Sequence, residues 1–502
     1  MEWWSAAGWL TTGVAALAAV FLYYEYKFSY WRRRGVPHPR PVPVLGNFEP
    51  LQLGRKNFAQ GLVDQALPFR ERGFCGLYQF GQPMLLVWDP EMAKQVLCKD
   101  FAAFHDRGVP VDERDPLTWR NLRNRLSPTF TSGKLKLMLP LMRDVGQELS
   151  AAVVAASSAA DAEEVEIDTL LFRYATDVIG TVAFGIQCNS LRDQGDQFLA
   201  MSRQVLNQSP AQLARLVLEA IHPRLGRLLP YKWIVSNVHD FFLGLVRDTV
   251  KHREENKVVR NDFVQLLMQL RDQELAQADP DKHIALTPGV MAAQSFIFFV
   301  AGLDNISNTV SFCLSRLAAD TGLQDRVAAE VRDVLHQHGG ELSYETLKKM
   351  DLLNRTVLEG LRLWSPIGLI IRQCNAPTQV GGVLVDKGVP VVILADVMHS
   401  DENLFPEPKR FDPDRHTAEA RAQRHPYAFL PFGEGPRVCI AERLALLEMR
   451  LALATLLRDF AFAVGPGYED EVQLDPKAFF PRPKNGFKLR VLVRCAPSGS
   501  PD

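Results

Sequence analysis

The chain has 502 residues, of which 47% are hydrophobic and 23% are charged, so it can bury a large core. Its 57 basic and 58 acidic residues give a formal net charge of −1, which does not favour nucleic acid as a partner. Seven scattered cysteines, with neither a CxxC pair nor metal-ligand spacing, indicate a reducing compartment and argue against a disulfide scaffold.

The first predicted element is an apolar helix at the N-terminus. From Trp3 to Tyr24 no residue is charged, and a helix of this length spans the roughly 30 Å hydrocarbon core of a membrane. Only Glu2 precedes the stretch, whereas Lys27 and three arginines follow it, so the positive-inside rule places the rest of the chain in the cytosol. A cleaved signal peptide is the alternative, but its charge would lie on the other side. We therefore expect a membrane anchor over residues 1–26.

A stiff linker is predicted next, because four prolines between residues 37 and 43 prevent a helix and disfavour a central strand. We assign a basic, proline-rich hinge to residues 27–46, one catalytic domain to 47–495 and a flexible tail to 496–502. No internal repeat or low-complexity block interrupts the domain.

The domain is expected to be mainly helical with small strand pieces. GFCGLYQF and MLLVWD, joined by GQP, read as a hairpin, and a second is expected around residues 380–394 with Lys387-Gly388 at its turn. Residues 214–234 are expected to form an amphipathic helix pair or, alternatively, a lid that dips into the membrane. Apolar residues at helical spacing predict helices at 134–155, 168–184, 234–256, 262–277, 289–319, 323–337, 343–364 and 440–459.

The predicted helix at 289–319 contains the stretch FVAGLDNISNT, which holds two residues that a buried helix normally rejects. Gly302 costs roughly 1 kcal/mol against alanine in a helix interior. Asp304 carries a charge that apolar neighbours disfavour. Both residues therefore need a functional explanation, and Asn305 follows them directly.

Further along the chain, Glu359 and Arg362 are three residues apart on one predicted helix, so their side chains can pair. An exposed pair of this kind would contribute little. Buried together with Arg415, the pair would instead form a charge-assisted network that fixes the loop leading to Cys439.

The strongest chemical signal is PFGEGPRVCIAERLALLEMRLALATLL at residues 431–457. Gly433 and Gly435 bracket a turn ahead of Cys439, and a long apolar helix follows at once. Such a loop can direct backbone N–H groups at the sulfur, and the positive end of the helix dipole also stabilises a thiolate. With Phe432 beside it and no histidine in the segment to act as its base, Cys439 suits an axial haem ligand better than a nucleophile.

Five motifs in this order resemble those of the cytochrome P450 superfamily. RLSPTFTSGKLK and the Arg107-Gly108 pair further resemble the branch that holds vertebrate family 3 and insect family 6 enzymes. The matching positions are Trp119 and Arg123 (WxxxR), Ala301 to Asn305 (the oxygen-side helix), Glu359 and Arg362 (ExxR), Arg415 (PERF segment), and Phe432, Gly435, Arg437 and Cys439 (FxxGxRxC).

The resemblance implies the cytochrome P450 fold, haem b with Cys439 as the ligand of its iron, and electrons from NADPH through a partner reductase, with cytochrome b5 as a further candidate partner. It also implies an endoplasmic reticulum membrane protein whose catalytic domain faces the cytosol. Arg107 by itself reads as a surface residue. The implied haem-propionate partners are Arg123, Arg372 and Arg437, with Trp119 as an indole N–H donor, and arginines 120, 123, 125, 437 and 443 could meet an acidic reductase.

On the oxygen side, the resemblance gives Gly302 the task of clearing the approach of haem and dioxygen, and makes Asp304 a proton carrier. Asn305 stands where the family usually has threonine, and an amide cannot pass a proton onward as a hydroxyl does. Ala441 and His416 replace a glycine and a phenylalanine. The implied substrate pocket contains Val300, Ala301, Ile367, Ile370 and Phe480, or its neighbour Phe479.

We therefore expect a membrane-anchored haem-thiolate monooxygenase that inserts one oxygen atom from O2 into a small lipophilic substrate. The alternative is a haem-thiolate isomerase or dehydratase that converts a hydroperoxide or endoperoxide without NADPH. SNTVSF, TAEAR and KNGF are similar to segments of thromboxane-synthase-type enzymes, which act in this way and also lack the alcohol. A haem-binding protein that has lost its activity is the third hypothesis. Asn305 is the residue that discriminates the first two.

Overall fold

The computed structural model describes residues 2–43, 45–48, 58–108, 123, 126–158, 163–193, 195–206, 236–277, 286–476, 478 and 481–494. Within these residues the fold is mainly helical with three small sheets. The predicted elements at 214–234 lie outside the described residues.

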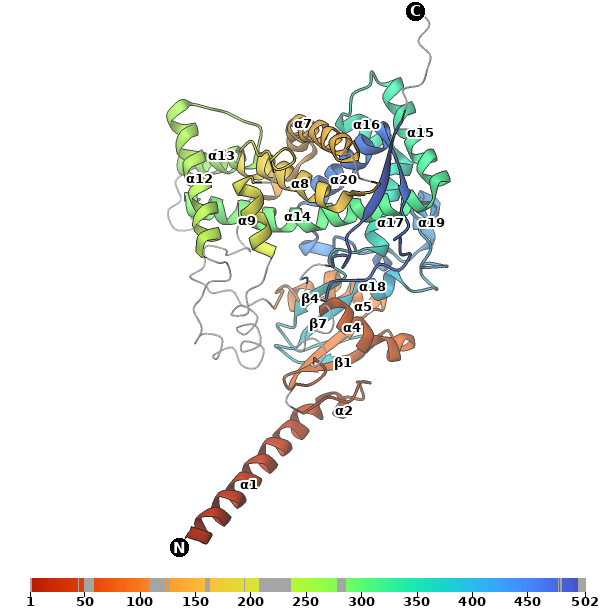
Figure 1. The fold of residues 1–502 in the computed structure, drawn as a ribbon. Helices are drawn as coiled ribbons and strands as arrows, with labels where there is room; N and C mark the ends of the chain where they lie inside the picture. The colour runs from red at the N-terminus through yellow and green to blue at the C-terminus, as the bar shows by residue number, and fades with distance from the viewer. Residues whose placement is uncertain are drawn as a thin grey trace, which may run out of the picture.

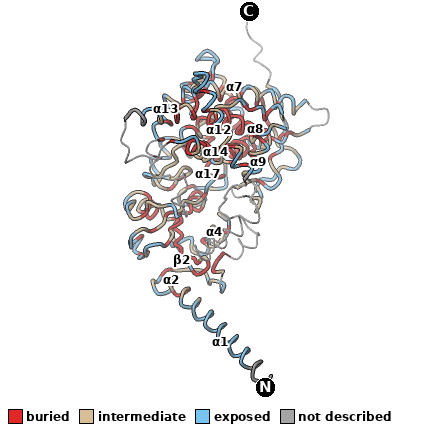
Figure 2. The backbone as a smooth tube through the Cα atoms, turned by 90° about the vertical axis from the view of Figure 1, so that its left-hand side faces the viewer, coloured by how far each residue is buried: buried red, intermediate tan, exposed pale blue. Residues whose placement is uncertain are grey.

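Helix α1 (Glu2–Phe28) projects alone from the body and is exposed along most of its length (Figures 1 and 2). Its base is fixed to the body by Trp31, which is fully buried and donates its indole N–H to the carbonyl of Leu77 at 2.9 Å. The hydroxyl of Tyr78 donates to the carbonyl of Phe28 at 2.6 Å and accepts the backbone N–H of Trp31 at 2.9 Å. The end of the exposed helix is therefore part of the folded body.

The largest sheet has the strand order β1-β2-β7-β4. Strands β1 (Phe74–Gln79) and β2 (Gln82–Val87) form the first predicted hairpin, which is confirmed. Strand β7 (Pro390–Leu394) runs parallel to β2 and antiparallel to β4 (Leu369–Gln373). This sheet lies next to the base of α1 (Figure 1).

The prediction of a second hairpin with its turn at Lys387-Gly388 is wrong. The hairpin is formed by β5 (Thr378–Val380) and β6 (Val383–Val385), and its turn is Gly381-Gly382, with φ angles of 55° and 82°. Two consecutive positive φ angles suit glycine and give the tight turn that matches strand twist. The Lys387-Gly388 turn instead leads from β6 to β7, which belong to different sheets.

The third sheet has the order β3-β9-β8, in which β9 (Lys488–Val493) lies between β3 (Val165–Glu166) and β8 (Phe460–Val464). The helices of the body, including several short ones that the periodicity missed, are α2 (Tyr30–Arg33), α4 (Phe58–Ala66), α5 (Pro90–Lys94), α7 (Ser132–Ser157), α8 (Ile167–Ile179), α9 (Gln197–Leu206), α12 (Ser236–Asn256), α13 (Phe263–Gln277), α14 (Pro288–Ala319), α15 (Thr321–Gln337), α16 (Tyr344–Lys349), α17 (Asp351–Leu363), α18 (Ala395–His399), α19 (Ala418–Gln423) and α20 (Glu442–Asp459).

Two of the predicted helices need correction. The range 343–364 contains two helices, α16 and α17, because Met350 leaves the helical conformation with ψ at 80°. The range 168–184 ends in a wider π-helical turn at Gly180–Phe184 after α8. Apolar spacing alone cannot show either interruption, since the side chains on both sides still face the core.

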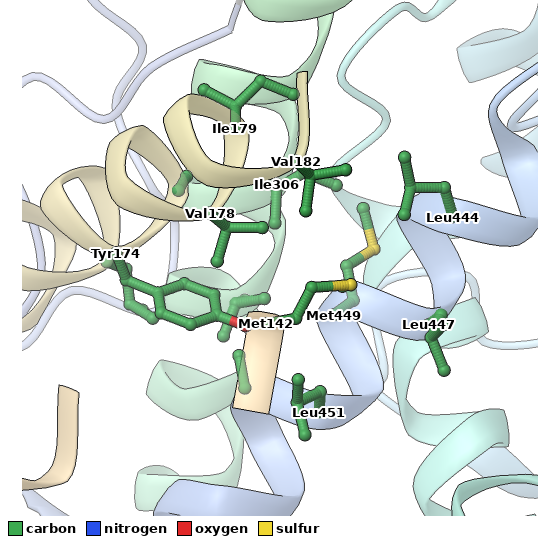
Figure 3. Packing of buried hydrophobic residues seen from close by; sticks show 14 of the residues in the cluster. Met142, Tyr174, Val178, Ile179, Val182, Ile306, Leu444, Leu447, Met449 and Leu451 are labelled. Carbon is green, nitrogen blue, oxygen red and sulfur yellow. The ribbon is translucent and has the colours of Figure 1, made fainter. Parts of the chain in front are cut away.

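The main hydrophobic core lies around α14. Side chains from α7, α8, α14 and α20 meet there, among them Met142, Tyr174, Ile306 and Met449 (Figure 3). Within the described residues, α14 is long and apolar enough to cross a membrane, but most of its residues are buried inside the body. It is therefore the central helix of the fold, and it carries the stretch at 299–309.

Candidate active site

The six described cysteines are free, and four of them are buried. Cys439 is partly buried and follows the turn Gly435–Arg437, three residues before α20 begins. Its backbone N–H donates to the carbonyl of Phe432 at 2.9 Å, which closes the loop. Gly435 has a φ of 77°, and a Cβ there would lie 2.4 Å from the carbonyl oxygen of Leu97, so only glycine fits.

Several neighbouring groups act on the pKa of the Cys439 thiol, and they act in opposite directions. Burial raises the pKa of the thiol, whereas the backbone N–H of Ala441, directed at the sulfur, lowers it. Glu442 raises the pKa further, and the charges of Arg123 and Arg107 lower it. A cation bound directly to the sulfur would settle this balance in favour of the thiolate.

Four arginines gather beside the cysteine loop. Arg372 is buried, and burial together with the charges of Arg107, Arg437 and Arg123 lowers its pKa to about 10. The pKa of Arg123 is also lowered, first by burial and then by Arg437. Like charges this close repel one another unless an anion lies between them.

Backbone carbonyls, rather than carboxylates, are the partners of these arginines. No carboxylate of the described residues forms an ion pair with any of the four, and Nε of Arg372 is buried without a partner. The bonds run from Nη2 of Arg107 to Arg437 (3.3 Å), from Nη2 of Arg123 to Val438, from Nε of Arg437 to His105 (3.3 Å) and from Nη1 of Arg372 to Ile371 (2.8 Å).

The position of Arg107 depends on an added piece of strand. The segment 103–108 runs along β4, since the N–H of Gln373 donates to the carbonyl of Asp106 at 2.9 Å and that of Asn375 to Ala103 at 2.7 Å. Arg107 has a large accessible surface, but it is not an ordinary surface residue: burial by its surroundings and the charges of Arg123 and Arg437 lower its pKa, and its own charge acts on Arg372. The sequence offered no signal for this pairing except the Arg107-Gly108 resemblance.

The donor set fits haem. A cluster of guanidinium groups without a described carboxylate partner suits two propionates, and a free cysteine beside it suits an axial ligand. The predicted indole donor Trp119 lies outside the described residues, as do Arg120 and Arg125. The described residues contain no group of three or more His, Cys, Asp or Glu side chains that could hold a metal ion.

A buried ion-pair network supports the segment of chain that leads to the cysteine loop. Arg362 donates to Glu359 through Nε and Nη2, both at 2.8 Å, and neither side chain is exposed. Nε of Arg415 lies 3.5 Å from Oε1 of Glu359. Burial raises the pKa of Glu359, but the hydrogen bonds from Arg362 and His416 outweigh it, so the carboxyl group stays ionised.

Arg362 also holds the segment ahead of the cysteine loop. Its guanidinium donates to the carbonyls of His399 at 2.7 Å, Pro408 at 2.8 Å and Arg410 at 3.2 Å. His416 is a fourth member of the network that the sequence missed: its Nε2 lies 3.0 Å from Oε2 of Glu359. The signal in the sequence was the histidine at a position where the family has phenylalanine, but the family pattern gives no polar role there because phenylalanine has no polar side-chain atom.

On α14, the residues of the FVAGLDNISNT stretch divide between two faces. Ala301 is exposed and Val300 is half-buried, although both belong to the central helix. The amide Nδ2 of Asn305 donates to the carbonyl of Ala301 at 2.8 Å, while its Oδ1 is buried without a partner. Thr309 donates its hydroxyl to the carbonyl of Asn305 at 2.7 Å. No hydroxyl side chain therefore projects at the position of Asn305.

Asp304 and Gly302 have other surroundings than the sequence suggested. Both carboxylate oxygens of Asp304 accept from Nη2 of Arg482, at 3.0 and 2.9 Å. A Cβ at Gly302 would lie 3.1 Å from Cδ1 of Ile179, so the absence of a side chain at Gly302 lets α8 pack closely against α14. This contact gives the glycine a packing role beside α8, and its expected role toward haem and dioxygen stays a prediction.

Of the remaining predicted pocket residues, Ile370 lies near the cysteine loop. Ile367, in the turn just before β4, is 49% exposed, which is a high value for an isoleucine. Ile370 is half-buried, and its Cδ1 lies 3.8 Å from where a Cβ of Gly433 would be. Phe479 and Phe480 lie outside the described residues.

Comparison with known proteins agrees with this geometry. Residues 36–491 match the family model described as cytochrome P450. The chain is 36% identical over 487 residues to the probable cytochrome P450 6a14 of Drosophila melanogaster, covering 92% of this chain and 95% of that protein. It is also 36% identical over 495 residues to cytochrome P450 6a2 of the same organism, covering 95% of this chain and 98% of that protein.

Proposed function

Because this chain belongs to the cytochrome P450 family and is accordingly a haem-dependent oxidoreductase, we propose that it inserts one oxygen atom from O2 into a small lipophilic substrate, using electrons from NADPH delivered by a membrane-bound reductase. The observation that carries this proposal is the position of Cys439 beside a cluster of four arginines for which no carboxylate partner is described. Bound haem supplies the activation of dioxygen, and the protein residues bind, orient and protect the reactants.

Each group around the cysteine loop has a proposed task. Cys439 serves as the axial thiolate, with the N–H of Ala441 stabilising its charge. Arg123, Arg372 and Arg437 would neutralise the propionates of bound haem, joined by Arg107 and, by resemblance, by Trp119, and Phe432 would help to hold the cofactor. The Glu359, Arg362 and Arg415 network keeps the segment ahead of the loop in place.

Val300, Ala301, Ile367 and Ile370 would contribute exposed or half-buried apolar surface to the substrate pocket, which would exclude water and suit a lipophilic substrate. Asn305 has its Nδ2 committed to the helix, and its Oδ1 is buried without a partner, so the side chain offers neither a free donor nor an accessible acceptor. We propose that Asn305 does not relay protons itself.

The exposed apolar surface of α1 supports the membrane anchor. Trp9, Leu10 and Leu17 are among its most exposed residues, and water would not favour them on an isolated helix. We propose a single-pass protein of the endoplasmic reticulum with its catalytic domain in the cytosol. Arg437 and the exposed Arg443 lie near Cys439 in the sequence and would face an acidic reductase, or cytochrome b5, on that side.

The test uses membranes that contain the full chain and a cytochrome reductase. A panel of lipophilic compounds, including a fatty-acid hydroperoxide, is incubated under labelled dioxygen with and without NADPH, and Cys439→Ser membranes serve as the control. Labelled product that requires NADPH supports the proposal. Unlabelled conversion of the hydroperoxide without NADPH would overturn it in favour of the isomerase. No conversion that exceeds the Cys439→Ser control, despite bound haem, would also contradict it.

A further inference from the structure

The ion pair between Asp304 and Arg482 joins the central helix to the C-terminal part of the chain. The side chain of Asp304 is only 6% exposed, whereas that of Arg482 is 39% exposed. Successive residues of a helix are rotated by about 100°, so Asp304 points well away from its neighbour Asn305. The carboxylate is therefore committed to Arg482 on a different face from the one that Asn305 and Ala301 share.

A second contact follows one turn along α14. Asn308 donates its Nδ2 to the carbonyl of Pro481 at 3.4 Å, so two consecutive residues, Pro481 and Arg482, are held by two residues on one face of the helix. The pair Asp304 and Asn308 is spaced four residues apart, which places both side chains on the same stripe.

The segment that Arg482 belongs to is itself a narrow stem. The N–H of Asp475 donates to the carbonyl of Arg482 at 2.9 Å, and that of Lys484 to Gln473 at 2.8 Å. Leu474 and Pro483 form an isolated antiparallel bridge between these two bonds. The backbone bonds fix the stem internally, Leu474 packs against the main core, and Arg316 of α14 binds Asp470 just before the stem. Pro481 and Arg482 add the contacts of the second strand of the stem with α14.

We infer that Asp304 is a positioning residue: through Arg482 it clamps the stem formed by residues 473–475 and 482–484 against the turn of α14 that carries Ala301 and Asn305, and so sets how large a ligand the site accepts. This inference rests on the proposed function, because it takes the exposed face of that turn to be a wall of the haem pocket. It replaces the proton-carrying role that the sequence suggested for Asp304.

A proton carrier and a clamp make different demands on the carboxylate. A carrier must exchange its proton with water and with the reaction centre, which requires a mobile and hydrated group. A clamp must stay paired, and here both oxygens accept from one guanidinium nitrogen. Burial raises the pKa of Asp304, and the charge and hydrogen bonds of Arg482 oppose that rise, so the ion pair is what keeps the carboxylate charged. Removing either partner would leave the other charge without compensation and release the stem.

The experiment compares Asp304→Asn, Arg482→Gln and the double variant in the haem-loaded full chain. Hydrogen exchange is followed at the amides of Asp475 and Lys484. Dissociation constants of two haem-binding azoles, small 4-phenylimidazole and bulky clotrimazole, are measured by absorbance. Arg490→Gln, which removes an exposed ion pair with Glu163 on the same C-terminal region, is the matched control.

We expect each single variant to speed exchange at these amides several-fold and to change the ratio of the two azole constants at least three-fold. The double variant should be no worse than either single one, and Arg482→Lys should restore part of the wild-type ratio. Haem content and thermal unfolding verify that each variant is folded. Arg490→Gln should leave both readouts unchanged.

The inference is overturned if Asp304→Asn leaves exchange and the azole ratio unchanged but increases hydrogen peroxide release during NADPH oxidation, while Arg482→Gln behaves as wild type. That outcome would return Asp304 to proton delivery. Because azole binding and hydrogen exchange need bound haem but no turnover, they remain informative even if the NADPH-dependent reaction is absent. Failure of the clamp is thereby separated from failure of the proposed function.

Discussion

Asn305 is the residue whose chemistry departs furthest from the family pattern. Its Nδ2 is tied to the carbonyl of Ala301, and the hydroxyl of Thr309 is tied to Asn305 itself, so neither group is free to pass a proton. The remaining polar atom, Oδ1, is buried without a partner, and an amide oxygen accepts hydrogen bonds without releasing a proton in return.

We predict that Asn305→Thr increases the fraction of NADPH electrons that reach product, by roughly two-fold or more, because a hydroxyl can both accept and donate a proton. The measurement is the ratio of product formed to NADPH consumed. Asn305→Gln keeps an amide at this position and serves as the control. An unchanged or lower ratio in Asn305→Thr would count against a proton-handling role for this position.

Glu448 gives a second prediction at this scale. It lies in the core on α20, its Oε1 has no partner, and burial raises its pKa to about 8. In the unfolded chain a glutamate has a pKa near 4.3, so between roughly pH 4.3 and 8 the folded protein keeps a proton that the unfolded chain releases. Stability therefore falls as pH rises through this window.

Glu448→Gln mimics the protonated acid at every pH and should abolish this loss. The difference in melting temperature between variant and wild type should be small at pH 5 and grow to a few degrees at pH 8, since one pKa unit corresponds to about 1.4 kcal/mol. Glu419→Gln, on the exposed α19, controls for general effects of lost charge. A difference that stays constant with pH would disprove the assignment.

At the scale of elements, the two glycines of the cysteine loop allow a matched comparison. Both have positive φ angles, 72° at Gly433 and 77° at Gly435, so alanine costs about 1–2 kcal/mol at either position. Only Gly435 is also in close contact, with Leu97 and Cys98 across the loop. Gly435→Ala should therefore lose most of its bound haem while Gly433→Ala retains it. Equal haem retention in the two variants would contradict the packing argument.

The bounds of a helix could be predicted where the spacing of apolar residues within its own segment determines them. Helices α7, α12, α14 and α20 begin and end within two residues of their predicted ranges, because apolar spacing records which face is buried. The pairing of β7 was not predictable, since a turn at Lys387-Gly388 shows that the chain reverses but not which strand lies beside it.

The candidate site divides in the same way. Cys439 and the Glu359–Arg362 pair could be named because their key partners are close in sequence and match a known motif. Arg482 could not be paired with Asp304, nor Arg107 with Arg372, because each pair is brought together by segments far apart in the chain. Charge alone does not reveal such a partner.

At the scale of the whole molecule, the end of α1 is packed into the body, whereas the predicted anchor and hinge would leave the two separate. The predicted boundary at residue 26 lies just before Phe28 and Trp31, which are buried against β1. The ring of Trp31 occupies the space where a side chain at Gly76 would be. Because α1 ends in the core, it cannot be removed at an arbitrary residue without affecting the body.

We predict that deletion of residues 1–23 releases a folded protein from membranes, whereas deletion of residues 1–33 also destabilises the body. Loss of a buried tryptophan or phenylalanine costs about 3–5 kcal/mol, so the longer deletion should lower the melting temperature clearly. Membrane sedimentation and thermal unfolding of both deletions measure the two effects. Equal stability of the two would show that Trp31 does not support the fold, and membrane retention of the shorter one would contradict the anchor.

The crowding of Arg107, Arg123, Arg372 and Arg437 also bears on the life of the protein in a cell. Four positive charges held close together oppose folding, and an anionic ligand that binds only the folded chain offsets their repulsion. The folded fraction of newly made polypeptide should then follow the supply of haem. A haem-starved cell would degrade the chain rather than store it, so its abundance would report haem synthesis as well as transcription.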